Sequence, residues 1–148
     1  MIRFHIVSIF PDVVRAYCEA SILGRAKEKK LISVSYTDPR DYAQNKWGKI
    51  DERPYAGGPG MVMMADPLTR AIDSIIKAVS RRRNSRAKVI IFSPNGTQFT
   101  NIYAKKLVSK YTDIILVAGR YEGIDARVGK IFRAEEVSVG PFVLTGGE

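Results

Sequence analysis

The chain has 148 residues, of which 45% are hydrophobic, and this length and composition favour a single domain with one core. Its 24 Lys and Arg residues against 15 Asp and Glu residues give a net charge of +9, which predicts a polyanionic partner, nucleic acid first. No apolar run of about 18 residues and no basic amphipathic helix occurs, so a membrane partner is not predicted.

Cysteine and histidine are each present once. A single cysteine, Cys18, excludes an internal disulfide and a cysteine-cluster metal site, and the cytoplasm is the expected compartment. A single histidine, His5, argues against histidine-based zinc chemistry. Because His5 lies in a predicted strand, a structural role is favoured over a catalytic one.

The first 36 residues predict a strand, two helices and a second strand. Residues 2–9 are apolar and β-branched and end in a Phe-Pro-Asp turn, where Asp12 is expected to cap a helix. Residues 13–30 have helical spacing that is broken near Ser21, which predicts two short helices. Residues 31–36 alternate between apolar and polar, as expected of a half-buried strand near an edge of the sheet.

Residues 42–60 show no hydrophobic periodicity and predict a long loop, and loops of this length are usually functional or disordered. Basic and aromatic residues alternate in it and suit base stacking and phosphate contact, although a flexible surface loop fits equally well. The apolar residues 61–64 that follow fit either the core or a subunit interface. The basic and aromatic residues are Lys46, Trp47, Lys49, Arg53 and Tyr55.

Residues 67–80 predict an amphipathic helix, with Asp66 as its N-cap and Pro67 in its first turn. The basic run at 81–86 suits backbone phosphates, but such a run is more often a solvated linker. An RNA contact there is therefore the minor interpretation.

The second half of the chain predicts alternating strands and helices. Residues 87–92 predict a buried strand that breaks in a turn at 93–96, and Thr100 is expected to cap a helix that ends at Ser109. The apolar run 114–117 predicts a strand that is buried on both faces.

That strand ends at residues 119–123, where two glycines bracket a basic, an aromatic and an acidic side chain. In open α/β sheets ligands bind at the carboxyl ends of the strands, so this turn is a candidate ligand loop. A purely structural connection, with Asp125 capping a helix over 125–132, fits the spacing about equally well. A third glycine-punctuated loop is expected at 137–148.

Six motifs, in order and over essentially the whole chain, resemble the bacterial tRNA (guanine-N1)-methyltransferases of the TrmD family. Three are the loops: Ser-Pro-Asn-Gly at 93–96, Gly-Arg-Tyr-Glu-Gly-Ile-Asp at 119–125 and Val-Gly-Pro-Phe-Val-Leu-Thr-Gly-Gly-Glu at 139–148. The others are Ser-Ile-Phe-Pro at 8–11, Asp-Pro-Arg-Asp at 38–41 and Arg-Pro-Tyr-Ala-Gly-Gly-Pro-Gly-Met at 53–61.

The resemblance implies a SPOUT-type α/β fold over residues 1–148, with a mostly parallel sheet flanked by helices and a deep trefoil knot in the C-terminal half. Sequence patterns could not have predicted a knot, since knots are nearly absent from protein folds. The resemblance also implies a homodimer whose active site lies between the subunits. The family's C-terminal tRNA-binding domain is expected to be absent, because this chain stops at Glu148.

The resemblance further implies that the three loops close around S-adenosylmethionine. Glycines there would let main-chain groups approach the adenine edge. Pro141 stands where the family commonly has an acidic residue, which removes a charge and a backbone donor, and Ala56 replaces a usual glycine. By position, the implied contacts are Phe92, Ser93, Pro94, Gly119, Tyr121, Glu122, Val139, Gly140, Pro141, Phe142, Val143, Leu144, Gly146 and Gly147.

The implied reaction is methyl transfer to N1 of the guanosine just 3′ of the tRNA anticodon. That nitrogen carries a proton, so a general base is required, and in the family the base is an aspartate beyond the Gly-Gly-Glu motif. This chain is therefore expected to lack the base, and Glu122 remains as the implied catalytic residue and as a possible Mg²⁺ ligand. RNA contacts are expected from Arg53, Tyr55, Gly57, Gly58 and Arg120.

Two alternatives to an enzyme stay open at this point. One is a non-catalytic module that binds S-adenosylmethionine or RNA, in keeping with the absent base region and the +9 charge. The other, a nucleotide-phosphate binder of another α/β class, is disfavoured because the chain has neither a Gly-x-Gly-x-x-Gly motif nor a P-loop.

Overall fold

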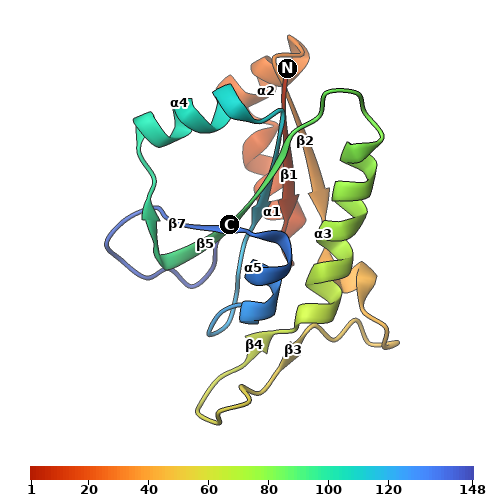
Figure 1. Ribbon diagram of the computed structural model, residues 1–148, viewed down its shortest axis with the longest axis vertical. Helices are drawn as coiled ribbons and strands as arrows, with labels where there is room; N and C mark the ends of the chain where they lie inside the picture. The colour runs from red at the N-terminus through yellow and green to blue at the C-terminus, as the bar shows by residue number, and fades with distance from the viewer.

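The computed structural model describes all residues 1–148 and shows a five-stranded parallel sheet with helices on both faces (Figure 1). The spatial order of the strands is β2-β1-β6-β5-β7. The strands are β1 (Ile2–Val7), β2 (Ile32–Thr37), β5 (Ala87–Gln98), β6 (Asp113–Val117) and β7 (Glu135–Ser138). The helices are α1 (Pro11–Cys18), α2 (Ser21–Glu28), α3 (Ala65–Ser80), α4 (Asn101–Lys110) and α5 (Ala126–Phe132).

The expected long loop is not entirely irregular. It begins after a short 3₁₀ helix, η1 (Pro39–Tyr42), and contains β3 (Asp51–Glu52), which pairs antiparallel with β4 (Val62–Met63). Met63 is fully buried, which places this part of the methionine cluster in the core. The remaining glycine-rich stretch between the two short strands is exposed.

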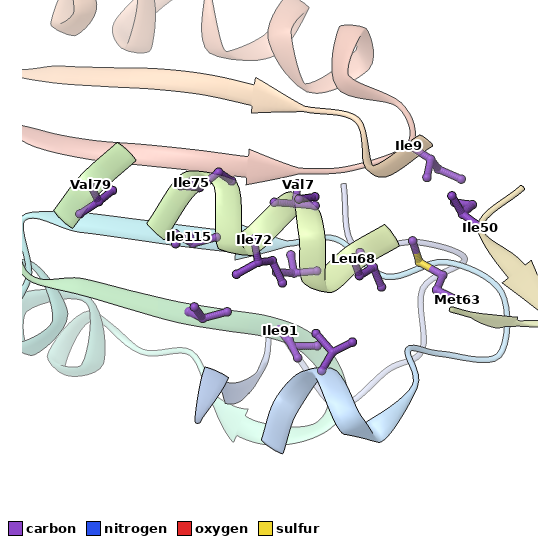
Figure 2. Packing of buried hydrophobic residues seen from close by; sticks show 14 residues of the cluster. Val7, Ile9, Ile50, Met63, Leu68, Ile72, Ile75, Val79, Ile91 and Ile115 are labelled. Carbon is purple, nitrogen blue, oxygen red and sulfur yellow. The ribbon is translucent and has the colours of Figure 1, made fainter. Parts of the chain in front are cut away.

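The central strand β6 is buried on both faces, as its β-branched residues predict. On one face, the apolar side of α3 packs on β1, β5 and β6, and Figure 2 shows its residues directed at Val7 and Ile115. On the other face, Leu107 of α4 packs against Ile90 and Ile114. Each such buried aliphatic side chain stabilises the fold by about 1.5–3 kcal/mol.

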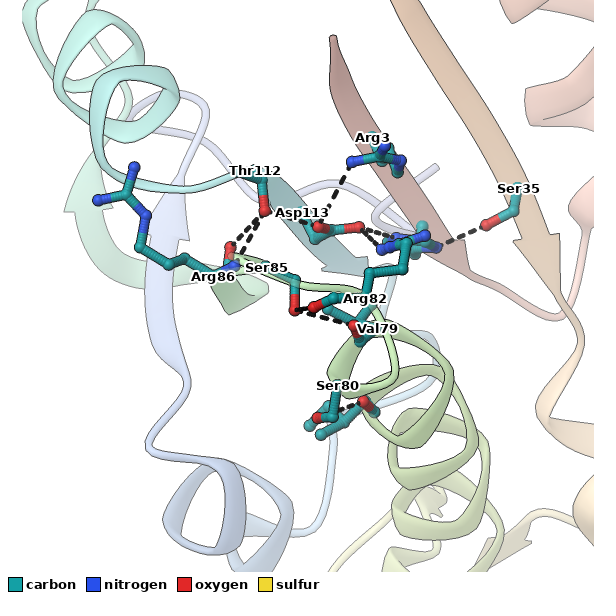
Figure 3. Close-up of polar contacts among 11 residues, drawn as sticks. Arg3, Ser35, Val79, Ser80, Arg82, Ser85, Arg86, Thr112 and Asp113 are labelled. Carbon is teal, nitrogen blue, oxygen red and sulfur yellow. Dashed lines mark hydrogen bonds and ion pairs between the residues drawn. The ribbon is translucent and has the colours of Figure 1, made fainter.

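At the amino end of β6, the buried carboxylate of Asp113 holds four neighbouring side chains together (Figure 3). Thr112 Oγ1 donates to Asp113 Oδ2 at 2.7 Å, and His5 Nε2 lies 2.9 Å from Asp113 Oδ1. Arg82 donates to Oδ1 through Nη2, and Arg3 Nη1 lies 3.9 Å from Oδ2.

This cluster confirms the structural role predicted for His5, whose second nitrogen, Nδ1, lies 2.8 Å from Ser35 Oγ on the edge strand β2. Burial by itself raises the pKa of Asp113, but the hydrogen bonds from His5 and Thr112 and the charge of Arg82 outweigh burial. The net pKa of Asp113 is lowered, so its carboxylate stays charged.

Two predicted helix caps are wrong. Asp12 and Asp66 lie in the first turns of α1 and α3, whose N-caps are Phe10 and Met64 without a side-chain cap bond. In α1, Pro11 begins the helix because its fixed φ suits the first helical position, so the helix starts one residue before the aspartate. The cap predicted for α4 is confirmed, because Thr100 Oγ1 accepts from the Tyr103 amide at 3.1 Å.

The turn predicted at 93–96 is also wrong, because β5 continues through it to Gln98. The strand instead shifts its register between Phe92 and Thr97, both of which are aligned with Val137 of β7. A Cβ atom at Gly96 would collide with the backbone of β7, so the glycine permits close approach rather than a break. Sequence patterns had not indicated β7 itself.

The α/β class and the parallel sheet are confirmed, whereas the trefoil knot stays a prediction. No helix is both long enough and apolar enough to cross a membrane.

Candidate functional site

A pocket of about 1000 Å³ lies at the carboxyl ends of the parallel strands. It is the edge where α/β folds bind ligands, because the strands end there and their connecting loops diverge. Three segments that are distant in sequence supply most of its lining, namely residues 92–95, 118–126 and 136–148 without Gly140 and Pro141. The predicted convergence of the three loops is therefore observed.

The loop after β6 is fixed from two sides. The Ala118 amide donates to the Val7 carbonyl at 2.9 Å, and the Glu122 amide donates to the Met61 carbonyl at 2.9 Å. Between them Tyr121 adopts a φ of +60°, a left-handed conformation that costs a residue with a side chain about 1–3 kcal/mol. The surrounding hydrogen bonds hold this strained turn, so the loop is organised before any ligand arrives.

The C-terminal segment packs directly on this loop through its glycines. The Gly147 amide donates to the Gly119 carbonyl at 3.0 Å. A Cβ atom at Gly147 would lie 2.9 Å from Ala118 Cα, closer than side chains normally come. Glycine is required at this position because two backbones meet here.

An ion pair fastens the same contact. Arg120 Nε lies 3.0 Å from Glu148 Oε2, and Ser8 Oγ donates to Glu148 Oε1 at 2.8 Å. The side chain of Glu148 is only 9% exposed. The guanidinium of Arg120 also lies 4.7 Å above the Phe10 ring, a cation–π distance. The carboxyl end of β1 thus joins the other two segments through Ser8 and Phe10.

Asp125 caps α5, as predicted, and also forms an ion pair with Arg127. Its Oδ1 accepts from the Arg127 amide at 2.9 Å, and Arg127 Nη2 lies 2.6 Å from Oδ2. The Arg127 side chain hydrogen-bonds Asp125 and holds the pKa of that carboxyl below its usual range, although burial opposes the shift. The pKa of Arg127 is raised by the same hydrogen bond.

Four carboxylates line the pocket, and two of them have no ion-pair partner. Asp125 and Glu148 are paired with arginines, whereas Glu122 and Glu136 are not. Glu122 lies beside the β3–β4 loop, where a Cβ atom at Gly60 would stand 2.7 Å from its Oε1. Glu122 and Glu136 therefore offer unpaired negative charge to a cationic ligand, and Lys130 is the one unpaired cation of the lining.

No group of three His, Cys, Asp or Glu side chains is arranged to hold a metal ion. Glu122 therefore lacks the further protein ligands that a preformed cation site provides. The Mg²⁺ role expected for Glu122 stays a prediction.

Of the predicted cofactor contacts, two do not line the pocket. Gly140 is buried and its carbonyl accepts from Ser138 Oγ at 2.8 Å, and Pro141 is exposed. The residues that do line it are Phe92, Ser93, Pro94, Gly119, Tyr121, Glu122, Val139, Phe142, Val143, Leu144, Gly146 and Gly147.

Most residues expected to contact RNA lie outside this pocket. Arg120 is the exception, since it belongs to the pocket lining and is engaged by Glu148. The other four, Arg53, Tyr55, Gly57 and Gly58, lie on the β3–β4 loop. Tyr55 is 83% exposed, and its hydroxyl accepts a long, 3.4 Å hydrogen bond from Arg127. This contact joins the loop to α5, and the RNA roles stay predictions.

Sequence reasoning gave no role to Ser8, Phe10 or Glu136, yet all three lie at or beside the site. Ser8 and Phe10 could have been found, because they follow β1 at the same carboxyl edge as the ligand loops. Glu136 could not, since its position depends on β7, which no periodicity indicated.

A family model described as tRNA (Guanine-1)-methyltransferase TrmD matches residues 2–148. A protein named tRNA (guanine-N(1)-)-methyltransferase from Myxococcus xanthus (strain DK1622) is 46% identical over 143 residues, which are 97% of this chain and 56% of that protein. The protein of the same name from Thermomicrobium roseum is 43% identical over 146 residues, covering 99% and 53% of the two chains.

Among solved structures, the tRNA (m1G37) methyltransferase from Aquifex aeolicus superposes with a TM-score of 0.83 at 34% sequence identity. The match covers 99% of this chain and 63% of the Aquifex chain. The chain spans about half the length of the curated relatives it matches.

Proposed function

The chain belongs to the tRNA (guanine-1)-methyltransferase TrmD family, and we propose that it forms the S-adenosylmethionine-binding domain of an enzyme that methylates N1 of the guanosine 3′ to the tRNA anticodon. The observation that carries this proposal is the convergence of three separate segments on one pocket at the carboxyl edge of a parallel sheet. Members of a family that share the fold over nearly the whole chain also share the place where such a pocket forms.

The pocket residues suit this cofactor in shape and charge. Bound S-adenosylmethionine supplies a methyl group on a positively charged sulfur. At Gly119 and Gly147 the absence of side chains lets two of the lining segments meet backbone to backbone, which holds this wall of the pocket in one shape. The unpaired carboxylates of Glu122 and Glu136 favour a cationic ligand, while the charge of Arg120 is already taken up by Glu148.

Methylation replaces the N1–H bond of neutral guanine by an N1–CH₃ bond. The methyl group moves from sulfur to N1, the N1 proton passes to a base, and S-adenosylhomocysteine leaves. Charge that builds on the neighbouring carbonyl oxygen needs stabilisation. Within the pocket we assign a catalytic role to Glu122, acting on the guanine directly or through Mg²⁺.

Two partners follow from the proposal. The tRNA would approach over the β3–β4 loop, which carries Arg53 and Tyr55 beside the pocket. A second copy of the chain would cover the apolar side chains that the C-terminal segment exposes, because such a patch marks an interface. These side chains are Val139, Phe142, Val143 and Leu144, which are between 50% and 80% exposed.

The test is calorimetric titration with S-adenosylmethionine, followed by a methyl-transfer assay on unmodified tRNA with and without Mg²⁺. The proposal expects saturable binding that S-adenosylhomocysteine competes and ATP does not. Absence of cofactor binding, or equal competition by ATP, would overturn it. Cofactor binding without transfer would support the alternative of a non-catalytic module for these residues.

A single substitution tests the role of Glu122. Glu122→Gln keeps the size of the side chain and removes its charge, so transfer should fall at least tenfold more than cofactor affinity does. The matched control is Glu28→Gln, at the exposed end of α2, which should change neither. Equal losses of binding and transfer in Glu122→Gln would show a binding role instead.

A further inference from the structure

The amino ends of the strands form a second continuous edge, on the side of the sheet away from the pocket. The connections that enter β2, β1, β6 and β5 are tied together by backbone hydrogen bonds at this edge. The Ile2 amide donates to Leu31, the Arg3 amide to Thr112, and the Thr112 and Asp113 amides both donate to Arg86, at 3.0–3.3 Å. The hydrogen bonds hold these connections side by side, so the charged side chains that they carry lie on one continuous surface.

Six cations on this surface have no acidic partner, and we call them the basic edge. They extend from the ends of α2, α3 and α4, the three helices that lead into the sheet here. No ion pair engages any of them, whereas Arg120 and Arg127 on the pocket side of the sheet face carboxylates. The residues of the basic edge are Lys29, Lys30, Arg81, Arg83, Arg86 and Lys110.

The buried cluster beneath this surface adds to its positive charge. Arg3 and Arg82 share the single carboxylate of Asp113, so one of the two guanidinium charges is not neutralised. Their side chains remain 28% and 38% exposed. Figure 3 shows that the side chain of Arg86 extends away from the cluster, and its guanidinium has no contact there.

Cations near helix ends also stabilise the helix dipole, by about 0.3–1 kcal/mol each, but that effect falls off within the last turn. Arg83 and Arg86 lie beyond the last turn of α3, which ends at Ser80. The dipole therefore does not explain Arg83 and Arg86, which leaves a solvated linker or a ligand of opposite charge.

The dimensions fit a sugar-phosphate backbone. Four neighbouring strands at about 4.8 Å spacing make the edge roughly 15 Å wide, and each strand of a double helix presents one phosphate per about 3.4 Å of helix axis. A double helix lying along the edge would therefore pass about four phosphates of one strand over it. It is built from short connections rather than from an amphipathic helix with an apolar face, which disfavours a membrane surface.

We propose that the basic edge binds the phosphate backbone of RNA, without reading its sequence, at a site separate from the pocket. β1 runs from this edge to the pocket, and its six residues span about 20 Å. The choice of RNA over other polyanions rests on the proposed function, and the bound strand is then a part of the tRNA remote from the methylated guanosine.

The experiment measures tRNA binding by fluorescence anisotropy over a series of salt concentrations. The test variant is Arg81→Gln, Arg83→Gln and Arg86→Gln combined, which leaves Arg3, Arg82 and the Asp113 cluster intact. The matched control is Arg25→Gln, Lys105→Gln and Lys106→Gln combined, three exposed cations on α2 and α4 that likewise have no ion-pair partner. Each triple variant lowers the net charge of +9 by the same three charges.

The proposal expects the slope of log affinity against log salt to fall by about two to three in the test variant and by less than one in the control. Equal slopes for the two variants would overturn it, since charge alone would then explain the binding. Tighter binding to phosphatidylserine vesicles than to tRNA, lost in the test variant, would also overturn it and assign the edge to a membrane.

Cofactor titration of the same variants separates this inference from the proposed function. If the test variant keeps both S-adenosylmethionine binding and the wild-type salt slope, the proposal for the basic edge is refuted and the proposed cofactor pocket is not. If the wild-type chain does not bind S-adenosylmethionine, the proposed cofactor pocket is refuted. The salt slopes of tRNA binding then still test the basic edge.

Discussion

The two edges of one sheet use charge in opposite ways. At the carboxyl edge, Arg120 and Arg127 are paired with Glu148 and Asp125, and the paired charges fix the loops that form a pocket. At the amino edge, one buried carboxylate, Asp113, organises the interior while the outer cations stay unpaired. The paired charges hold a pocket of defined shape in which Glu122 and Glu136 stay free, whereas the free cations of the amino edge suit a flexible polyanion.

The largest expected effect is on the amino edge. Asp113→Asn removes the charge that His5, Arg3 and Arg82 surround, and breaking such a buried pair costs about 3–5 kcal/mol of unfolding free energy. Urea unfolding measures this loss. The control is Asp73→Asn, whose exposed pair with Lys77 on α3 should cost about 0.5 kcal/mol or less. A loss below about 1 kcal/mol for Asp113→Asn would show that the cluster is not what organises this edge.

The next effect tests the carboxyl edge. Gly147→Ala adds a methyl group where the two backbones meet, so the C-terminal segment must shift by overpacking that costs about 1–3 kcal/mol. We expect S-adenosylmethionine affinity to fall about tenfold to a hundredfold in calorimetry. The control Pro141→Ala, at an exposed residue outside the pocket lining, should change affinity less than twofold. A larger effect of Pro141→Ala would restore it to the cofactor site.

A smaller effect is expected from the ion pair that fastens the pocket. Glu148→Gln keeps a hydrogen-bond acceptor for Ser8 but removes the charge opposite Arg120, and we expect cofactor affinity to fall about fivefold. The loss should be less at 1 M salt, where the Debye length is about 3 Å. If the loss grows with salt, the pair does not act through its charge.

The smallest effect concerns acid. The pKa values of Asp113 and Asp125 are lowered in the folded chain, so the unfolded chain binds protons more readily. Stability is therefore full above the ordinary carboxyl pKa of about 4 and is lost as the pH falls through the folded values.

Asp125→Asn keeps a helix cap and removes one titrating group, so unfolding free energy should fall less steeply below pH 4 than in the wild type. The difference should stay below about 1 kcal/mol because the partner guanidinium is 58% exposed. Urea unfolding at several pH values measures it. The control is Asp66→Asn, in an exposed pair on α3, whose unfolding free energy should depend on pH as in the wild type. A steeper fall of the unfolding free energy in Asp125→Asn would contradict a lowered pKa of Asp125.

Sequence periodicity determined the secondary structure well where the elements carry their own signal. The buried run 114–117, the amphipathic residues 67–80 and the cap at Thr100 all reflect burial or hydrogen bonds within a few residues. The family motifs marked the three segments that the fold brings together around one pocket. Local patterns thus determined the helices and the longer strands, but not β3, β4 or β7.

Tertiary structure alone decided how those segments meet. β7 and the register shift in β5 arise from pairing between strands about 45 residues apart, so no local pattern encodes them. The contact of Gly147 with Gly119 and the link from Ser8 to Glu148 join residues that only the strand order brings together. Likewise, the sequence showed the total charge of +9, but only the parallel topology gathered the six cations of the basic edge at the end of the sheet opposite the pocket. The physical reason is that all five strands are parallel, so every connection from a helix to a strand lies at the amino ends of the strands.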